Sequence, residues 1–202
     1  MFKTLSFVCL CLLSALSIPC SAANLLVFGD SLSAGYGIPR EQSWPALLDQ
    51  RLNKEGRPYT VVNASISGET TAGGRARLEA ALRQHHPAVV VIELGANDGL
   101  RGLPVEQMAD NLTALVRMAR QAGAKVLLVG MRLPPNYGPD YVSRFEGTFP
   151  TVAKKEKAAL LPFLLEPIAR EANAFQQDGL HPVAAAQPRL LDHVWSALKP
   201  LL

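Results

Sequence analysis

The sequence predicts an α/β fold, a three-layer α/β/α sandwich around a flavodoxin-like parallel sheet of about five strands. Short apolar runs alternate along the chain with amphipathic helical segments, and this alternation is typical of right-handed β-α-β units. The apolar runs are hydrophobic on both faces, as strands buried in a parallel sheet are. Residues 24–202 are long enough to bury one hydrophobic core, so we expect a single domain.

Five short runs rich in apolar and β-branched residues predict the strands. Residues 88–94 are the strongest candidate for the centre of the sheet, because they are apolar on both faces. The five predicted strands are residues 25–28, 59–64, 88–94 and 125–131, and a short run around Leu160 and Leu161.

Helical segments separate these strands. Ser43 is a suitable N-cap for a helix that begins at Trp44 and ends before Gly56. Apolar residues recur at nearly 3.6-residue spacing over 105–119, and Gly123 closes that segment. Three further helices are predicted, one that ends at His85, one over 141–157, and one that begins near Pro182.

Composition excludes two broad classes of protein. Charged residues make up 18% and hydrophobic residues 49% of the chain, a balance that excludes an intrinsically disordered protein. The formal net charge is only +3 and the Lys and Arg residues do not cluster, which argues against a nucleic-acid-binding protein.

Residues 1–23 have the pattern of a cleaved signal peptide. Lys3 supplies the positive start, residues 5–18 are apolar, and the small residues 21–23 provide a cleavage site before Asn24. A retained membrane anchor is the alternative, but the apolar stretch is short for a bilayer and no charged stop follows it. We therefore expect an exported protein, periplasmic or secreted in a Gram-negative bacterium, without stable membrane insertion after cleavage.

All three cysteines of the chain lie within the predicted signal peptide, at Cys9, Cys11 and Cys20. The mature chain therefore has no thiol. This excludes a disulfide, a cysteine metal ligand and a cysteine nucleophile.

Four polar turns follow predicted strands or precede the last helix. In a parallel sheet, the first three meet at one edge because all strands point the same way, and the segment after the last strand can bring the fourth there. The four turns are Gly29-Asp30-Ser31, Ser67-Gly68, Gly95-Ala96-Asn97-Asp98 and Asp178-Gly179-Leu180-His181.

Together these turns contain the groups that acyl transfer requires. Ser31 is the candidate nucleophile, His181 the base that takes its proton, and Asp178 the carboxylate that orients the imidazole. The backbone N–H groups of Ser31 and Gly68 and the side-chain amide of Asn97 are candidate donors for the oxyanion.

Each of these residues also has an ordinary structural explanation. Asp30 or Ser31 can cap the following turn, and Asp178 can cap the last helix or form a turn. A lone His181 before a proline is commonly a surface residue, and glycine and asparagine are common in turns. The inference rests on the occurrence of all these residues in this order and after these strands.

The four turns resemble the motif blocks of the SGNH (GDSL) hydrolase superfamily, beginning with Gly29-Asp30-Ser31-Leu32. Residues 63–68, 97–102 and 132–138 resemble more closely the bacterial periplasmic thioesterase I/protease I/lysophospholipase group, which includes arylesterases. The resemblance implies the SGNH hydrolase fold, with Ser31, Gly68, Asn97 and His181 as the name-giving residues and Asp178 completing the triad.

The resemblance implies a serine esterase that hydrolyses acyl esters and thioesters through an acyl-enzyme intermediate, without a cofactor. We expect it to be a monomer. The Gly-x-Ser-x-Gly signature of the α/β-hydrolases is missing around Ser31, which favours the GDSL family. The sequence has no long insertion for a lid, so we expect an open cleft. By analogy with related thioesterases, Leu78, Pro134 and Tyr137 are expected to bind the acyl chain; ordinary loop packing is the alternative.

Three other functions are alternatives to this reading of the sequence. A carbohydrate acetylesterase of the same superfamily is the alternative within the class. A flavodoxin-like protein that binds a nucleotide or flavin is the alternative of another class, although neither a Gly-x-Gly-x-x-Gly nor a P-loop motif is present. A metal enzyme is disfavoured because His85, His86 and His193 lack the spacing of metal ligands.

Overall fold

The computed structural model describes residues 22–202, so residues 1–21 of the predicted signal peptide lie outside the described residues. Five parallel strands form one sheet in the order β2-β1-β3-β4-β5. This is the flavodoxin-like order, and it confirms the predicted α/β fold. The strands are β1 (Ala23–Gly29), β2 (Tyr59–Asn63), β3 (Val89–Glu93), β4 (Lys125–Val129) and β5 (Ala159–Leu161).

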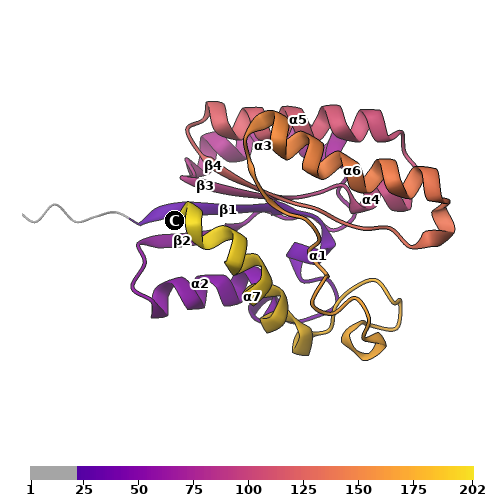
Figure 1. Cartoon of the computed structure of the whole chain (residues 1–202). Helices are drawn as coiled ribbons and strands as arrows, with labels where there is room; N and C mark the ends of the chain where they lie inside the picture. Colours follow the sequence, from indigo (N-terminus) through magenta and orange to yellow (C-terminus); the bar gives the residue numbers. More distant parts are fainter. Residues whose placement is uncertain (1–21) are drawn as a thin grey trace, which may run out of the picture.

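Helices cover both faces of the sheet (Figure 1). α3, α5 and α6 pack side by side on one face, whereas α2 and α7 pack together on the other. The α-helices are α1 (Ser31–Ala34), α2 (Trp44–Lys54), α3 (Thr71–His85), α4 (Ala96–Leu100), α5 (Val105–Gln121), α6 (Pro139–Glu156) and α7 (Gln187–Leu198). Short 3-10 turns lie at Arg40–Gln42, Pro135–Tyr137, Ala172–Ala174, Ala184–Ala186 and Lys199–Leu201.

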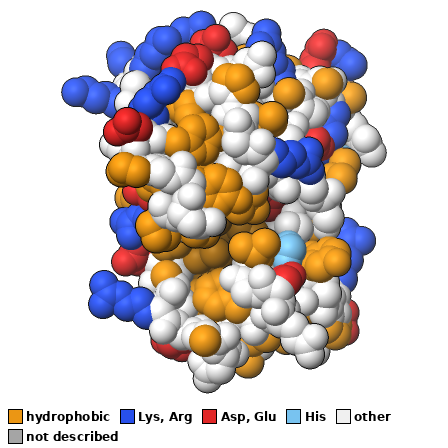
Figure 2. Space-filling view, turned by 90° about the vertical axis from the view of Figure 1, so that its right-hand side faces the viewer, with side chains coloured by type: hydrophobic (Ala, Val, Ile, Leu, Met, Phe, Trp, Pro, Cys, Tyr) orange, Lys and Arg blue, Asp and Glu red, His pale blue; other side chains and the backbone are white. Residues whose placement is uncertain are grey.

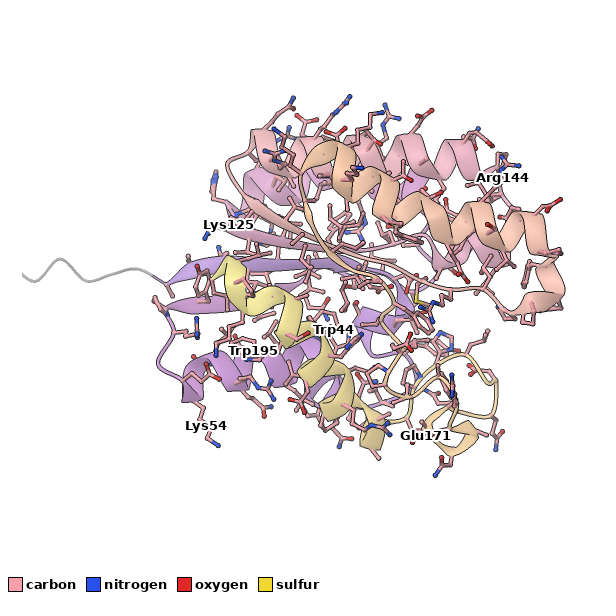
Figure 3. The ribbon with its side chains drawn as sticks, in the orientation of Figure 1. Trp44, Lys54, Lys125, Arg144, Glu171 and Trp195 are labelled. Atoms are coloured by element: carbon pink, nitrogen blue, oxygen red, sulfur yellow. The ribbon has the colours of Figure 1, made fainter. Side chains whose placement is uncertain are left out.

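The core lies on both sides of the central strand. Every residue of β3 is buried, because β1 and β4 flank it and helices cover both faces. On the α2 and α7 side, Trp44 is fully buried and its backbone N–H donates to Gln187 Oε1 at 2.9 Å, which joins the starts of the two helices. Trp195 lies in the same layer (Figure 3), and its ring is stacked by Arg51 and Arg57.

The last helix begins later than the sequence predicts. α7 starts at Gln187, not near Pro182. Pro182 instead pairs with Phe175 in an isolated antiparallel bridge, and a 3-10 turn over Ala184–Ala186 precedes the helix. Proline has no N–H and is pre-set for a helix start or an extended segment; here the bridge to Phe175 favours the extended form.

The topology brings the polar turns to one end of the molecule. β1, β2 and β3 are parallel, so the turns after them meet at the same edge, where Figure 1 shows α1 and α4. The chain after β5 runs to this edge before it turns back into α7. No helix within residues 22–202 has both the length and the hydropathy needed to cross a bilayer.

Candidate active site

The nucleophile candidate lies directly after the central part of the sheet. β1 ends at Gly29, and Ser31 is the first residue of α1. Asp30 is the N-cap of that helix, because its Oδ1 accepts a hydrogen bond from the backbone N–H of Leu32 at 3.0 Å. The capping role is therefore filled by Asp30, and the Ser31 hydroxyl is left for another partner.

That partner is the imidazole of His181. His181 Nε2 lies 2.8 Å from Ser31 Oγ, although 150 residues separate them in the sequence. The other ring nitrogen, Nδ1, lies 2.7 Å from Asp178 Oδ2. A carboxylate, an imidazole and a hydroxyl thus form one continuous chain.

The Asp178 carboxylate is also held by its own turn. Its Oδ1 accepts the backbone N–H groups of His181 at 3.0 Å and Leu180 at 2.9 Å. Hydrogen bonds from the backbone and ring of His181 and from the Leu180 N–H lower the pKa of Asp178 from 3.8 to about 2. Asp178 is therefore ionised at neutral pH.

The expected oxyanion donors line the same cavity as Ser31 and His181. Gly68 has a φ of +79°, a conformation that favours glycine, so its backbone rather than a side chain faces this region. Asn97, on the first turn of α4, donates from Nδ2 to Asp30 Oδ2 at 3.0 Å. An amide nitrogen has two hydrogens, so this bond orients the group and leaves the second hydrogen for a ligand.

A buried carboxyl group beneath the nucleophile turn, that of Glu93, was not identified from the sequence. Glu93 ends β3 and is fully buried, and its Oε2 accepts the Ser33 hydroxyl at 2.7 Å and the Asp30 N–H at 3.4 Å. Burial raises the pKa of Glu93 well above its ordinary value, and burial raises that of Asp30 from 3.8 to about 6. A single glutamate at the end of an otherwise apolar strand is the sequence signal that could have revealed Glu93.

A cavity of about 430 Å³ opens beside the Ser31 hydroxyl, and most of its wall is apolar. Figure 2 shows hydrophobic side chains gathered in a hollow across the middle of this face. One side of the wall comes from α4 and the chain after β4, and the other from the segment between β5 and α7. The apolar lining residues include Leu100, Met131, Leu133, Pro134, Phe163, Leu165, Ala169, Phe175 and Leu180.

Of the three residues expected to bind the acyl chain, only Pro134 lines this cavity. Leu78 lies elsewhere: it is fully buried in the core beneath α3, where no ligand can reach it. Tyr137 packs against the core, and its hydroxyl donates to the backbone oxygen of Leu100 at 3.0 Å. The part of the wall contributed by residues 163–180 was not predicted, because this irregular segment has no hydrophobic periodicity that reveals which side chains face inward.

Among the described residues, His85, His86 and His193 do not belong to any cluster of potential metal ligands. His193 Nε2 lies 2.9 Å from the backbone oxygen of Phe163. Within residues 22–202, no three His, Cys, Asp or Glu side chains lie close enough together to hold a metal ion.

Comparison with known proteins places this geometry in a family. The model of the GDSL-like lipase/acylhydrolase family matches residues 27–187. Among curated proteins, the chain is 56% identical over 182 residues to esterase TesA of Pseudomonas aeruginosa, covering 90% of each chain. It is 45% identical over 194 residues to an arylesterase of Vibrio mimicus, covering 96% of each chain.

A third relative is thioesterase 1/protease 1/lysophospholipase L1 of Escherichia coli, which is 43% identical over 182 residues, 90% of this chain and 86% of the relative. Among solved structures, the SGNH-hydrolase family esterase AlinE4 superimposes with a TM-score of 0.75 at 37% identity, covering 89% of this chain and 94% of the other. The resemblance found in the sequence motifs is thus confirmed. The chain belongs to the GDSL-like lipase/acylhydrolase family of SGNH hydrolases, and it is an ester hydrolase.

Proposed function

We propose that this protein is a serine esterase and thioesterase that cleaves medium- and long-chain acyl groups from thiol, phenol or glycerophospho-alcohol leaving groups. The observation that carries the proposal is the continuous chain of hydrogen bonds from Asp178 through His181 to Ser31, at the wall of an apolar cavity. The names of the relatives, an esterase, an arylesterase and a thioesterase/lysophospholipase, support this range of leaving groups.

In the first half of the reaction, His181 Nε2 takes the proton from Ser31 Oγ as this oxygen attacks the acyl carbonyl carbon. Asp178 stabilises the imidazolium that forms. Collapse of the tetrahedral intermediate breaks the bond to the leaving group, which receives the proton from His181. The products of this half-reaction are the free thiol or alcohol and an ester between the acyl group and Ser31.

In the second half, a water molecule replaces the leaving group. His181 takes one proton from the water molecule as the water oxygen attacks the acyl carbon. The bond between Ser31 Oγ and the acyl carbon then breaks, and His181 gives this proton to Ser31 Oγ. The carboxylic acid leaves and the free enzyme is restored. The same imidazole transfers the proton in each step, so the reaction as written requires only the substrate, water and these side chains.

In both halves, negative charge develops on the former carbonyl oxygen. The backbone N–H groups of Ser31 and Gly68 and the second amide hydrogen of Asn97 are the donors that we assign to it. The bond from Asn97 to Asp30 holds the amide in place before the substrate binds, so that little reorganisation is needed during the reaction.

The acyl chain occupies the apolar cavity. Burying one methylene group contributes about 0.8 kcal/mol, or roughly fourfold in an equilibrium constant. A cavity of about 430 Å³ can take several methylene groups, so chain length is expected to influence kcat/KM strongly. A carbohydrate acetylesterase binds a polar sugar and an acyl group with a single methyl group, so this apolar cavity favours longer acyl chains.

We also propose that the protein is exported after removal of residues 1–23 and acts as a monomer. The support for export is the composition of that segment, and cleavage before Asn24 removes only the first residue, Ala23, from β1. The mass of the mature protein from a periplasmic fraction tests the cleavage site, and light scattering tests the oligomeric state. A mass that includes residue 1 would contradict cleavage. A dimer in light scattering would contradict the monomer.

The function is tested by hydrolysis of p-nitrophenyl esters from acetyl to palmitoyl, and of palmitoyl-CoA, by the mature chain and by Ser31→Ala. We expect activity on medium and long chains that the substitution abolishes. Activity on acetyl esters alone would favour a carbohydrate deacetylase. No activity on any ester, with a thermal shift on addition of flavin or nucleotide, would favour a binding protein.

A further inference from the structure

The two loops that carry the catalytic groups are held in different ways. Ser31 lies two residues after the end of β1, so the sheet holds it in position. His181 instead lies in the long segment between β5 and α7, where Figure 1 shows the chain looping out beyond the end of the sheet. Here we call residues 30–37 the nucleophile loop and residues 175–182 the histidine loop. Contacts between the two loops must set the position of the imidazole.

Gln176 joins the two loops through its side chain. Its side-chain Nε2 donates to the backbone oxygen of Tyr36, in the nucleophile loop, at 2.8 Å. The same nitrogen donates to the backbone oxygen of Pro182, directly after His181, at 3.2 Å. One amide group thus joins the two loops, and its two hydrogens match the two carbonyl oxygens.

The backbone of Gln176 also makes two hydrogen bonds to the turn that carries His181. Its N–H donates to the backbone oxygen of His181 at 2.8 Å, and its carbonyl oxygen accepts from the N–H of Gly179 at 2.9 Å. The backbone of His181 itself and that of Gly179, two residues before it, are therefore both bonded to this one residue.

The nucleophile loop is shaped around this side chain. Gly37 has a φ of +73°, and a Cβ at this position would lie 2.1 Å from Gln176 Oε1. The ring of Tyr36 packs against the ring of His181, with 4.6 Å between the centroids. Gln176 does not line the substrate cavity, so its effect on the reaction must pass through other residues.

We infer that Gln176 is a positioning residue, whose side-chain amide locks the histidine loop to the nucleophile loop and so sets the distance between His181 and Ser31. The inference rests on the proposed function, since it assigns a role within the same catalytic pair. Leucine at position 176 keeps the approximate volume but loses both donors. Glutamate also loses both and directs a carboxylate at two carbonyl oxygens.

The test compares Gln176→Leu and Gln176→Glu with Gln177→Leu, which changes the neighbouring exposed glutamine outside these contacts. We expect kcat for p-nitrophenyl butyrate to fall about 10- to 100-fold in both Gln176 variants, because small displacements of a reacting group have effects of this size. KM is expected to stay within about twofold, because the cavity wall is intact. The control is expected to keep wild-type kcat.

Two further readouts separate positioning from a loss of stability. Thermal unfolding is compared across the variants, and kcat is measured well below every Tm. The low-field proton resonance of the His181–Asp178 pair is followed by NMR in the resting protein; we expect it to broaden in the Gln176 variants. A Gln176 variant with wild-type kcat, or an unchanged resonance, would overturn the inference.

A double-mutant cycle approaches the same contact from the other loop. Gly37→Ala pushes a Cβ into the Gln176 side chain, so we expect it to lower kcat by itself. Because both changes break one contact, Gly37→Ala with Gln176→Leu is expected to cost less than the sum of the two. Full additivity would contradict a shared contact.

Failure of the inference and failure of the proposed function give different results. If wild type hydrolyses esters and the Gln176 variants equal it, only the positioning role is wrong. If wild type hydrolyses no ester, the proposed function is wrong, and the NMR comparison still decides whether Gln176 holds His181 in place.

Discussion

Asparagine at position 178 should inactivate the protein while leaving its fold almost unchanged. In the wild type, Asp178 Oδ1 accepts two backbone N–H groups and Oδ2 faces His181 Nδ1. The amide oxygen of an asparagine can keep the two backbone bonds, but its NH₂ group must then face Nδ1. This arrangement places the imidazole proton on Nε2, which donates to Ser31 Oγ and cannot accept the proton of the nucleophile.

The size of the effect follows from the loss of the correct tautomer. The equivalent change in serine proteases lowers kcat by about 10⁴-fold. At about 1.4 kcal/mol per tenfold, this corresponds to about 5.5 kcal/mol of transition-state stabilisation. Asp178→Ala removes the two backbone bonds as well, so we expect similar inactivity with a lower Tm.

The assay is pre-steady-state acylation with p-nitrophenyl butyrate, in which release of p-nitrophenol reports the acylation half-reaction separately from deacylation. Tm is measured from pH 7 to pH 2 for wild type and Asp178→Asn. The folded-state pKa of Asp178 is lowered to about 2, so the stability that its carboxylate contributes is present above the ordinary value of 3.8 and is lost as the pH falls toward 2. The Tm difference should therefore shrink over that range.

A loss of acylation rate smaller than about tenfold, in a correctly folded Asp178→Asn variant, would refute this reasoning. It would mean that another group sets the tautomer of His181. Equal Tm values for the asparagine and alanine variants would refute the part assigned to the two backbone hydrogen bonds.

Three further results are expected. Asn97→Ala should lower kcat about 100- to 1000-fold with little change in KM, since it removes one oxyanion donor; a loss below tenfold would exclude that role. Glu93→Gln should gain stability relative to wild type as the pH rises from 5 to 9. Burial raises the pKa of Glu93, so the wild type loses stability as this carboxyl is forced toward its charged form; a Tm difference independent of pH would contradict this. EDTA should leave esterase activity unchanged, and a loss that added metal restores would contradict a metal-free mechanism.

The sequence determined the strands and the location of the site because both depend on local patterns. The run 88–94 is apolar on both faces, which predicts a strand at the centre of a parallel sheet, and small polar residues follow where it ends. Since parallel strands end at one edge, Ser31, Gly68 and Asn97 could be placed together before any contact was known. The α/β alternation then left few topologies to consider.

Tertiary structure decided which side chains meet, because periodicity gives the face of an element but not the partner across the chain. Leu78 and Pro134 are both apolar, yet one is enclosed by the core and the other faces the cavity. Asp30 rather than Ser31 caps α1, because the Asp30 carboxylate lies within hydrogen-bonding distance of the Leu32 N–H. Irregular segments carry no period at all, so the contact of Gln176 with Tyr36, 140 residues away, is fixed only when loop and sheet edge are packed together.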